Sequence, residues 1–108
     1  MYAENILIGN RDDFSTLKIA DFGLSAQFLS EGHTQIFSHQ CGTLSFMSPE
    51  LAQEKFYTKE VDIWSCGIIM YILLTGRHPL LRRQDNTKTF LQKLTNPNWD
   101  LEHTNFSE

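Results

Sequence analysis

Short apolar runs separated by polar, turn-forming residues open the chain. The run Asn-Ile-Leu-Ile at residues 5–8 is followed by turn-forming residues at 9–13 and then by Leu-Lys-Ile-Ala at 17–20. Two apolar runs on either side of such a turn predict a β-hairpin. After Asp21-Phe22-Gly23, polar and apolar residues mix without a period up to Phe46, which predicts a long loop. A loop of this length inside a compact domain is uncommon and usually functional.

The second half of the chain carries the signals of helices. Ser48 and Pro49 predict the start of a short helix at residues 49–53, because a serine hydroxyl can accept an orphan amide proton and proline already has a helical φ. We expect Thr58 to cap a second, longer helix. Gly76 should end that helix, because glycine commonly follows the last helical turn.

The second predicted helix is apolar on nearly every side. Its apolar stretch at residues 68–74 falls well short of the roughly 20 residues that a membrane-spanning helix needs. We therefore expect a helix buried inside a protein domain larger than itself. A third helix should follow, capped by Asp85 or Asn86 and with Phe90 and Leu94 on its apolar face. The Asn-Pro pair after that face should end it.

These elements give an α+β fold class, mainly α, in one piece of one domain. With 41% hydrophobic and 12% aromatic residues, the 108-residue chain can bury one modest core, which argues against disorder. The net charge of -4 is spread without a run of like charges. We therefore expect no nucleic acid and no membrane among the partners of this chain.

The cysteines and the first residues bear on the cellular setting. Cys41 and Cys66 lack the spacing of a disulfide framework or of a zinc site, so we expect reduced thiols. Met1 is followed by Tyr2 and Ala3 without the basic region and apolar core of a secretion signal. Both observations predict an intracellular, cytoplasmic protein.

Four short motifs stand in order along the chain. They are Glu4-Asn5 with the Ile-Leu-Ile that follows, Asp21-Phe22-Gly23, Cys41-Gly42-Thr43 leading to Ser48-Pro49-Glu50, and Asp62-Ile63-Trp64-Ser65-Cys66-Gly67. In this order and at these spacings the sequence resembles the eukaryotic protein kinase family, serine/threonine type. Residues 17–25 and 64–75 look most like the calcium/calmodulin-dependent kinase group.

The resemblance covers nearly the whole chain and carries a fold with it. It implies that residues 1–108 are a partial protein kinase domain, a fragment of the C-terminal lobe that runs from the end of the catalytic loop past the buried central helix. The long loop then corresponds to the activation loop. No second domain is expected.

The resemblance also implies a site for ATP and Mg²⁺. Hard Mg²⁺ prefers oxygen ligands and takes few of them from the protein, and an amide oxygen and a carboxylate are suitable. The resemblance gives these roles to Asn5 and Asp21, with Glu4 beside them, and it places Leu7 and Ala20 below the adenine ring. Taken alone, Asp21 would cap a turn, Asn5 would begin a strand, and the two apolar residues would belong to a core.

Other roles follow from the resemblance in the long loop. Phe22 would pack against a helix of the small lobe, and Gly23 would permit backbone angles that a side chain penalises. Thr43 would belong to the substrate-binding loop of a serine/threonine kinase. Ser38 is the preferred phosphorylation site, because His39 occupies the position where many relatives have a threonine; an unmodified polar loop is the alternative.

Two acidic residues are expected to be structural. Glu50 would pair with an arginine that lies late in the kinase domain, beyond Glu108. Asp62, at the start of the apolar helix, would accept hydrogen bonds from the catalytic-loop backbone. A buried Glu50 without its partner would be destabilising, because an unpaired buried charge is unfavourable.

The printed sequence departs from the family pattern in ways that bear on activity. It contains no His-Arg-Asp, whose aspartate orients the substrate hydroxyl, and no glycine-rich loop, and Tyr2-Ala3 stands where relatives read Lys-Pro. We therefore expect a fragment of a serine/threonine kinase that acts on ATP and protein substrates but is inactive alone and poorly stable. The alternative is a truncated kinase or pseudokinase lobe that serves as a protein-binding scaffold.

Overall fold

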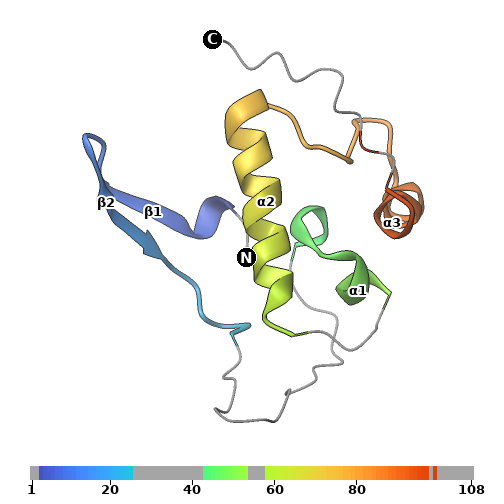
Figure 1. The fold of residues 1–108 in the computed structure, drawn as a ribbon, viewed down its shortest axis with the longest axis horizontal. Coiled ribbons are helices and arrows are strands. Elements are labelled where there is room, and N and C mark those ends of the chain that lie inside the picture. Colours follow the sequence, from blue (N-terminus) through green and yellow to red (C-terminus); the bar gives the residue numbers. More distant parts are fainter. Residues whose placement is uncertain (1–2, 26–42, 54–57, 98, 100–108) are drawn as a thin grey trace.

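A β-hairpin and three α-helices make up the structure, a computed structural model that describes residues 3–25, 43–53, 58–97 and 99. The elements in chain order are a 3₁₀ helix η1 (Ala3–Asn5), strands β1 (Ile6–Asn10) and β2 (Asp13–Ile19), a 3₁₀ helix η2 (Leu44–Phe46), and helices α1 (Pro49–Ala52), α2 (Glu60–Thr75) and α3 (Thr87–Thr95). Figure 1 shows α2 in the middle, the hairpin on one side of it, and α1 with α3 on the other. The predicted mixed, mainly helical fold is confirmed.

The hairpin forms as predicted but its strands are longer than the apolar runs. Strands β1 and β2 pair antiparallel, and the register sets Ile8 opposite Leu17 but Asn10 opposite Asp13. This shift is a bulge, and Gly9 sits where it needs to be small, because a Cβ there would lie 3.2 Å from the Cβ of Thr16. The predicted turn over residues 9–13 was too wide. Local hydrogen bonds hold residues 9 and 10 in β1 and residue 13 in β2.

Those local hydrogen bonds come from polar side chains. The Thr16 hydroxyl accepts from the Asn10 amide at 2.8 Å and donates to the Asp13 carbonyl at 2.7 Å. The Asn10 side-chain oxygen accepts from the Asp12 amide at 3.0 Å, which closes the turn. Polar residues that look like a loop therefore belong to the strands, because the Thr16 and Asn10 side chains form hydrogen bonds with backbone groups at the bulge and the turn.

The three α-helices lie where the sequence predicts them, with two differences at their starts. Helix α2 has Lys59 at its N-cap position instead of Thr58, without a side-chain cap. Ser48 is the N-cap residue of α1 as predicted, but its hydroxyl makes no cap hydrogen bond. Gly76 ends α2 in the left-handed region with φ 68°, where a side chain would be strained.

Helix α3 resolves the choice between two predicted caps. The Asn86 side-chain oxygen accepts from the Thr89 amide at 2.9 Å, so Asn86 is the cap. Asp85 instead accepts from the Arg82 amide at 2.8 Å and from Lys93 Nζ at 2.8 and 2.7 Å. The hydrogen bond from Lys93, with that of the Arg82 amide, lowers the pKa of Asp85. Asp85 therefore ties the loop before α3 to the end of α3.

The core lies on the side of α2 away from the hairpin. Leu80, Phe90 and Leu94 form its buried centre, and Trp64 and Leu44 pack against them with half-buried side chains. The core thus joins the loop after α2, helix α3, α2 itself and η2. Helices α1 and α3 also contact each other.

The all-round apolar helix is buried on one face only. Ser65, Ile68 and Ile69 are its buried residues, whereas Ile63 is 72% and Leu73 78% exposed. The hairpin leaves this outer face uncovered, and its own apolar residues are exposed as well. The prediction of a helix made for a larger domain agrees with this uncovered face. Within the described residues, no helix has both the length and the apolarity needed to cross a bilayer.

Candidate functional site

The open end of the hairpin brings the two predicted magnesium ligands together along the backbone. The Ala20 amide donates to the Asn5 carbonyl at 2.8 Å, one step beyond the Ile6–Ile19 pair. Asn5 therefore lies opposite Ala20, and Asp21 is the next residue on the second strand. Asn5 does not begin β1 but ends the short helix η1, in which Glu4 is exposed.

Asp21 has an unusual backbone. Its φ of 61° lies in the left-handed region, which aspartate and asparagine tolerate better than other side chains. Its Oδ1 accepts from the Gly23 amide at 3.2 Å, a turn that orients the carboxylate. A Cβ on Gly23 would lie 3.2 Å from the same Oδ1. The glycine thus lies close to the carboxylate, and the expectation of unusual backbone angles at Gly23 was wrong, because the left-handed angle belongs to Asp21.

The predicted adenine-contacting residues share one face of the hairpin. Leu7 lies opposite Lys18, and Ala20 is two residues further along, so Leu7 and Ala20 are on the same side of the ribbon. Leu7 is 54% exposed and Ala20 is half-buried. Phe22 is 67% exposed and packs into no core of the described residues. An apolar surface is therefore present beside the Asn5–Asp21 end.

The predicted substrate loop lies on the other half of the molecule and is firmly held. Thr43 is exposed at the start of η2, and its carbonyl accepts from the Phe46 amide at 3.1 Å. The buried hydroxyl of Ser65 donates to the Phe46 carbonyl, with oxygens 3.0 Å apart. Thus α2 fixes the end of this loop while leaving the Thr43 side chain accessible.

His78 fixes the same loop from the other side. Its Nε2 lies 2.7 Å from the Ser45 carbonyl, and its Nδ1 accepts from the amides of Leu80 and Leu81 at 3.1 and 2.8 Å. These partners assign the neutral tautomer with the proton on Nε2, because Nδ1 acts as an acceptor. Burial lowers the pKa of His78, and the nearby positive charge of Arg82 acts in the same direction. The ring also meets Phe90 edge to face at 5.7 Å.

The remaining predicted residues are placed apart from the hairpin. Glu50 is half-buried on α1, and no described residue forms an ion pair with it. Asp62 is exposed in the first turn of α2. Ser38 lies outside the described residues. The structure therefore brings the backbones of Asn5, Ala20 and Asp21 together. Glu50 and Asp62 lie on the helices instead.

Two residues that position the substrate loop were missed from the sequence. Ser65 was treated only as part of a motif, although a small polar residue in an otherwise apolar helix is a signal for a hydrogen bond to a neighbouring backbone. His78 was not singled out. Its contacts depend on a loop 33 residues earlier in the chain, which no local pattern reveals.

The donor set at the hairpin end fits magnesium better than a transition metal. Asp21 and Asn5 offer oxygen ligands from an accessible site. Within the described ranges no group of three or more His, Cys, Asp or Glu gathers that would suit a tightly held ion. Mg²⁺ usually takes one or two protein carboxylates and completes its shell with water and phosphate oxygens. Asn5 and Asp21 would hold such an ion together with the phosphates of ATP.

Comparisons with known proteins identify the family of the chain. The family model described as the protein kinase domain matches residues 1–107. The chain is 32% identical over 99 residues to the serine/threonine-protein kinase grp of Drosophila melanogaster, a match that covers 92% of this chain and 19% of that protein. It is 42% identical over 82 residues to the calcium/calmodulin-dependent protein kinase type 1 of Caenorhabditis elegans, covering 76% of this chain and 22% of that protein.

These matches identify the family and show how much of a relative the chain spans. The chain spans about a fifth of the length of each of these two relatives. One is named a serine/threonine-protein kinase, and the other is named a calcium/calmodulin-dependent protein kinase, the type that residues 17–25 and 64–75 resemble. Because the family model covers nearly every residue, the chain belongs to the protein kinase family.

Proposed function

We propose that this chain is the part of a serine/threonine protein kinase that holds Mg²⁺ and the phosphates of ATP and presents the substrate loop. The observation that carries the proposal is the hydrogen bond between the Ala20 amide and the Asn5 carbonyl. It sets the backbone of Asn5 opposite Ala20, one residue before Asp21, at one end of a two-stranded ribbon. Loss of that juxtaposition would remove the reason to assign a metal site here.

The residues of the chain would divide the work. Asp21, oriented by the Gly23 amide, would hold Mg²⁺ against the β- and γ-phosphates, and Asn5 would hold a second metal position. Leu7 and Ala20 would contact the adenine ring. In the transfer, the substrate hydroxyl oxygen would bond to the γ-phosphorus while the bond from that phosphorus to ADP breaks, and the hydroxyl proton would pass to an aspartate that these 108 residues do not supply. Mg²⁺ supplies charge neutralisation for the transferring phosphoryl group.

The substrate side is proposed to be the loop around Thr43. Its exposed side chain and its fixed backbone suit a surface on which a protein segment is laid. Such positioning contributes to rate because the reacting groups are held in an orientation close to the one that reacts. Glu50 and Asp62 would act structurally, and Ser38 would be the modification site. The setting is proposed to be intracellular, with reduced thiols.

The 108 residues should not catalyse transfer by themselves. They contain neither a His-Arg-Asp nor a glycine-rich loop. A scaffold that docks proteins beside residues 85–94 is the second candidate, favoured by Tyr2-Ala3 in place of Lys-Pro. The intact Asn5 and Asp21 favour the kinase instead.

Reading the coding sequence upstream of Met1 and assaying the longest product separates the two candidates. An in-frame His-Arg-Asp and glycine-rich loop, with MgATP-dependent transfer to serine or threonine, is the result expected of a kinase. Asp21→Asn should lower kcat by about 100-fold or more, because it removes charge from the metal site. Thr104→Ala, in the last residues of the chain, is the control. A longer product that binds partners but transfers no phosphate would favour the scaffold.

A further inference from the structure

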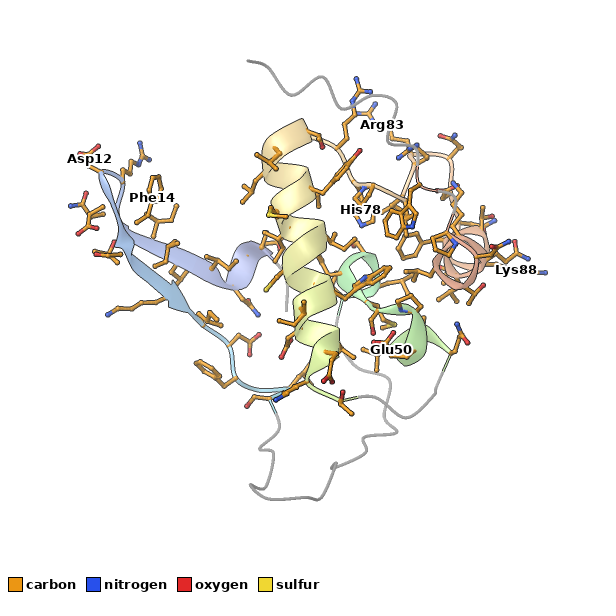
Figure 2. All side chains as sticks on the ribbon, in the orientation of Figure 1. Asp12, Phe14, Glu50, His78, Arg83 and Lys88 are labelled. Carbon is orange, nitrogen blue, oxygen red and sulfur yellow. The ribbon has the colours of Figure 1, made fainter. Side chains whose placement is uncertain are left out.

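Three of the four arginines of the chain line one hollow. It has a volume of about 540 Å³ and lies beside the C-terminal end of α2 and the loop that follows, where Arg77, Arg82 and Arg83 surround it together with His78. Its volume falls within the range of small-ligand sites. Figure 2 shows Arg83 and His78 on the same side of α2, on the loop that leads toward α3. The hollow is separate from the hairpin that carries Asn5 and Asp21.

Acidic residues in the described part of the chain balance only part of the positive charge of this hollow. Asp85 is the acidic residue of the same loop; its charge acts on Arg82, and both of its oxygens accept from Lys93. Glu60 and Asp62 lie in the first turn of α2, and a helix of 16 residues is about 24 Å long. That distance exceeds the Debye length of about 8 Å at physiological salt. Within the described ranges, Arg77 and Arg83 therefore give the hollow a positive charge at the C-terminal end of α2.

The structure of the helix end accounts for only part of this charge. The C-terminus of a helix carries a partial negative charge equivalent to about half an electron, which favours a single nearby cation. Arg82 has a second structural use, since its Nη1 donates to the His78 carbonyl at 2.9 Å. Arg77 and Arg83 are exposed. Two guanidinium groups are therefore accessible to a ligand at the rim of the hollow.

Hydrogen bonds of His78 hold one wall of the hollow in place and connect it to the predicted substrate loop. His78 lines the hollow, and its Nε2 lies 2.7 Å from the Ser45 carbonyl, two residues from Thr43. Its Nδ1 fixes the backbone that leads to Arg82. A protein segment laid along the loop around Thr43 would thus have a basic pocket within reach, on a rigid connection.

We propose that this hollow binds a carboxylate or phosphate group on a side chain of a protein segment that docks along the substrate loop. Guanidinium groups recognise both anions through paired hydrogen bonds. The net charge of -4 opposes a long polyanion, whereas one confined pocket suits a single acidic or phosphorylated side chain. That the segment is a substrate rests on the proposed function; the anion site itself does not.

Peptide binding to the 108-residue chain tests the site without any need for catalysis. Three fluorescent 12-residue peptides of otherwise Gly-Ala-Ser sequence would be compared by anisotropy at low salt, bearing three glutamates, one phosphoserine or three lysines. At least one anionic peptide should bind at least about tenfold more tightly than the lysine peptide, with affinity falling as salt rises. Competition by inorganic phosphate distinguishes recognition of the phosphate alone from recognition of the peptide.

Two double variants of equal charge change localise the binding. Arg77→Gln combined with Arg83→Gln should lower the affinity for the anionic peptide by about tenfold, equivalent to 1.4 kcal/mol. Lys59→Gln with Lys88→Gln removes the same charge from exposed positions outside the hollow and should change the affinity by less than about twofold. Equal losses in both double variants, or no preference over the lysine peptide, would overturn the proposal.

The folded state of each variant is a required control. All four substituted residues are exposed, so their far-UV circular dichroism at 10 °C should match that of the parent chain. Should the parent chain lack its helical signal, the comparison is made in a Ser48→Ala/Gly67→Ala background, which we expect to be more stable. If the anionic peptide binds undiminished when Arg77→Gln and Arg83→Gln are added to that background, the proposed site is contradicted. Because phosphoryl transfer is not measured, a negative result for this site says nothing against the proposed kinase function, and the two can fail independently.

Discussion

Single residues near the candidate sites carry conformations that their neighbours impose. Asp21 adopts a positive φ, and Gly23 is small because the Asp21 carboxylate lies against it. Ser48 is a contrasting case. It is 1% exposed at the start of α1, yet its hydroxyl has no hydrogen-bond partner among the described residues. Residue type predicted each of these positions as special, but the physical reason became visible only with the neighbours in place.

Ser48→Ala should raise stability instead of lowering it. Replacing an N-cap serine usually destabilises a protein by about 1 kcal/mol because a cap hydrogen bond is lost. No such bond exists here, and the substitution removes a buried hydroxyl without a partner, which should contribute about 1 kcal/mol of added stability. Urea unfolding followed by tryptophan fluorescence measures the change. A loss of 1 kcal/mol or more would show that the hydroxyl does cap α1.

Two glycines of α2 should respond to alanine in opposite directions. Gly76 ends the helix at φ 68°, so Gly76→Ala should destabilise by about 1 kcal/mol through the left-handed backbone alone, since no atom lies within 4 Å of the added Cβ. Gly67 lies inside the helix with equal space around it, so Gly67→Ala should stabilise by about 1 kcal/mol. The same urea titration compares the pair. Changes of one sign at both positions would contradict this assignment.

At the scale of elements, short-range patterns were predictable and long-range ties were not. The hairpin, the three helices and a cap of α3 at Asp85 or Asn86 follow from local residue types, and the structure selects Asn86. The length of β2 was missed because a bulge and its side-chain hydrogen bonds recruit polar residues into the strand. The connection from His78 to Ser45 was missed because it joins the loop after α2 to a segment far back in the sequence. Local propensity contains no information about such a pair.

The His78 connection predicts a pH dependence of stability. Burial lowers the folded-state pKa of His78 below its ordinary value of 6.5, so below about pH 6.5 the unfolded chain binds more protons than the folded one. The contribution of neutral His78 is therefore present above pH 6.5 and is lost as the pH falls through the lower folded-state value. Protonation would oppose two amide donors at Nδ1 and the positive charge of Arg82.

Urea titrations from pH 8 to pH 5 measure this dependence. His78→Asn keeps a side-chain acceptor near Nδ1 but does not titrate, so the difference between the two proteins isolates His78 from the three other histidines. We expect the two stabilities to converge as the pH falls. Parallel curves over the whole range would mean that His78 titrates as it does in the unfolded chain.

The whole molecule consists of a packed helical half and a hairpin that contributes little to the core. None of the strand residues is buried, whereas Phe90 and Leu94 are each 1% exposed. The uncovered face of α2 was implied by an apolar helix too hydrophobic for so small a chain, whereas the exposure of the hairpin was not predicted. What that face packs against in a larger domain has no signal within these residues.

Amide hydrogen exchange should reveal this division. The amides of Phe90 and Gly76, hydrogen-bonded at 3.0 and 2.8 Å in the helical half, should exchange at least about tenfold more slowly than that of Ala20, although its hydrogen bond is equally short at 2.8 Å. Mass spectrometry or NMR resolves these sites. Equal protection of the hairpin and the helical half would show one cooperative unit and contradict a marginally stable chain.

The most direct test of the account is where a divalent metal binds. Mn²⁺ with ATP, as a paramagnetic substitute for Mg²⁺, would be titrated into the ¹⁵N-labelled chain while amide signals are followed by NMR. We predict that broadening is strongest at Asn5 and residues 20–22, and that Asn5→Ala and Asp21→Asn each weaken it; Asp21→Asn retains a residue that tolerates the left-handed backbone. Broadening centred on the acidic turn at Asp12 and Asp13, unchanged in both variants, would contradict a shared metal position at the open end of the hairpin.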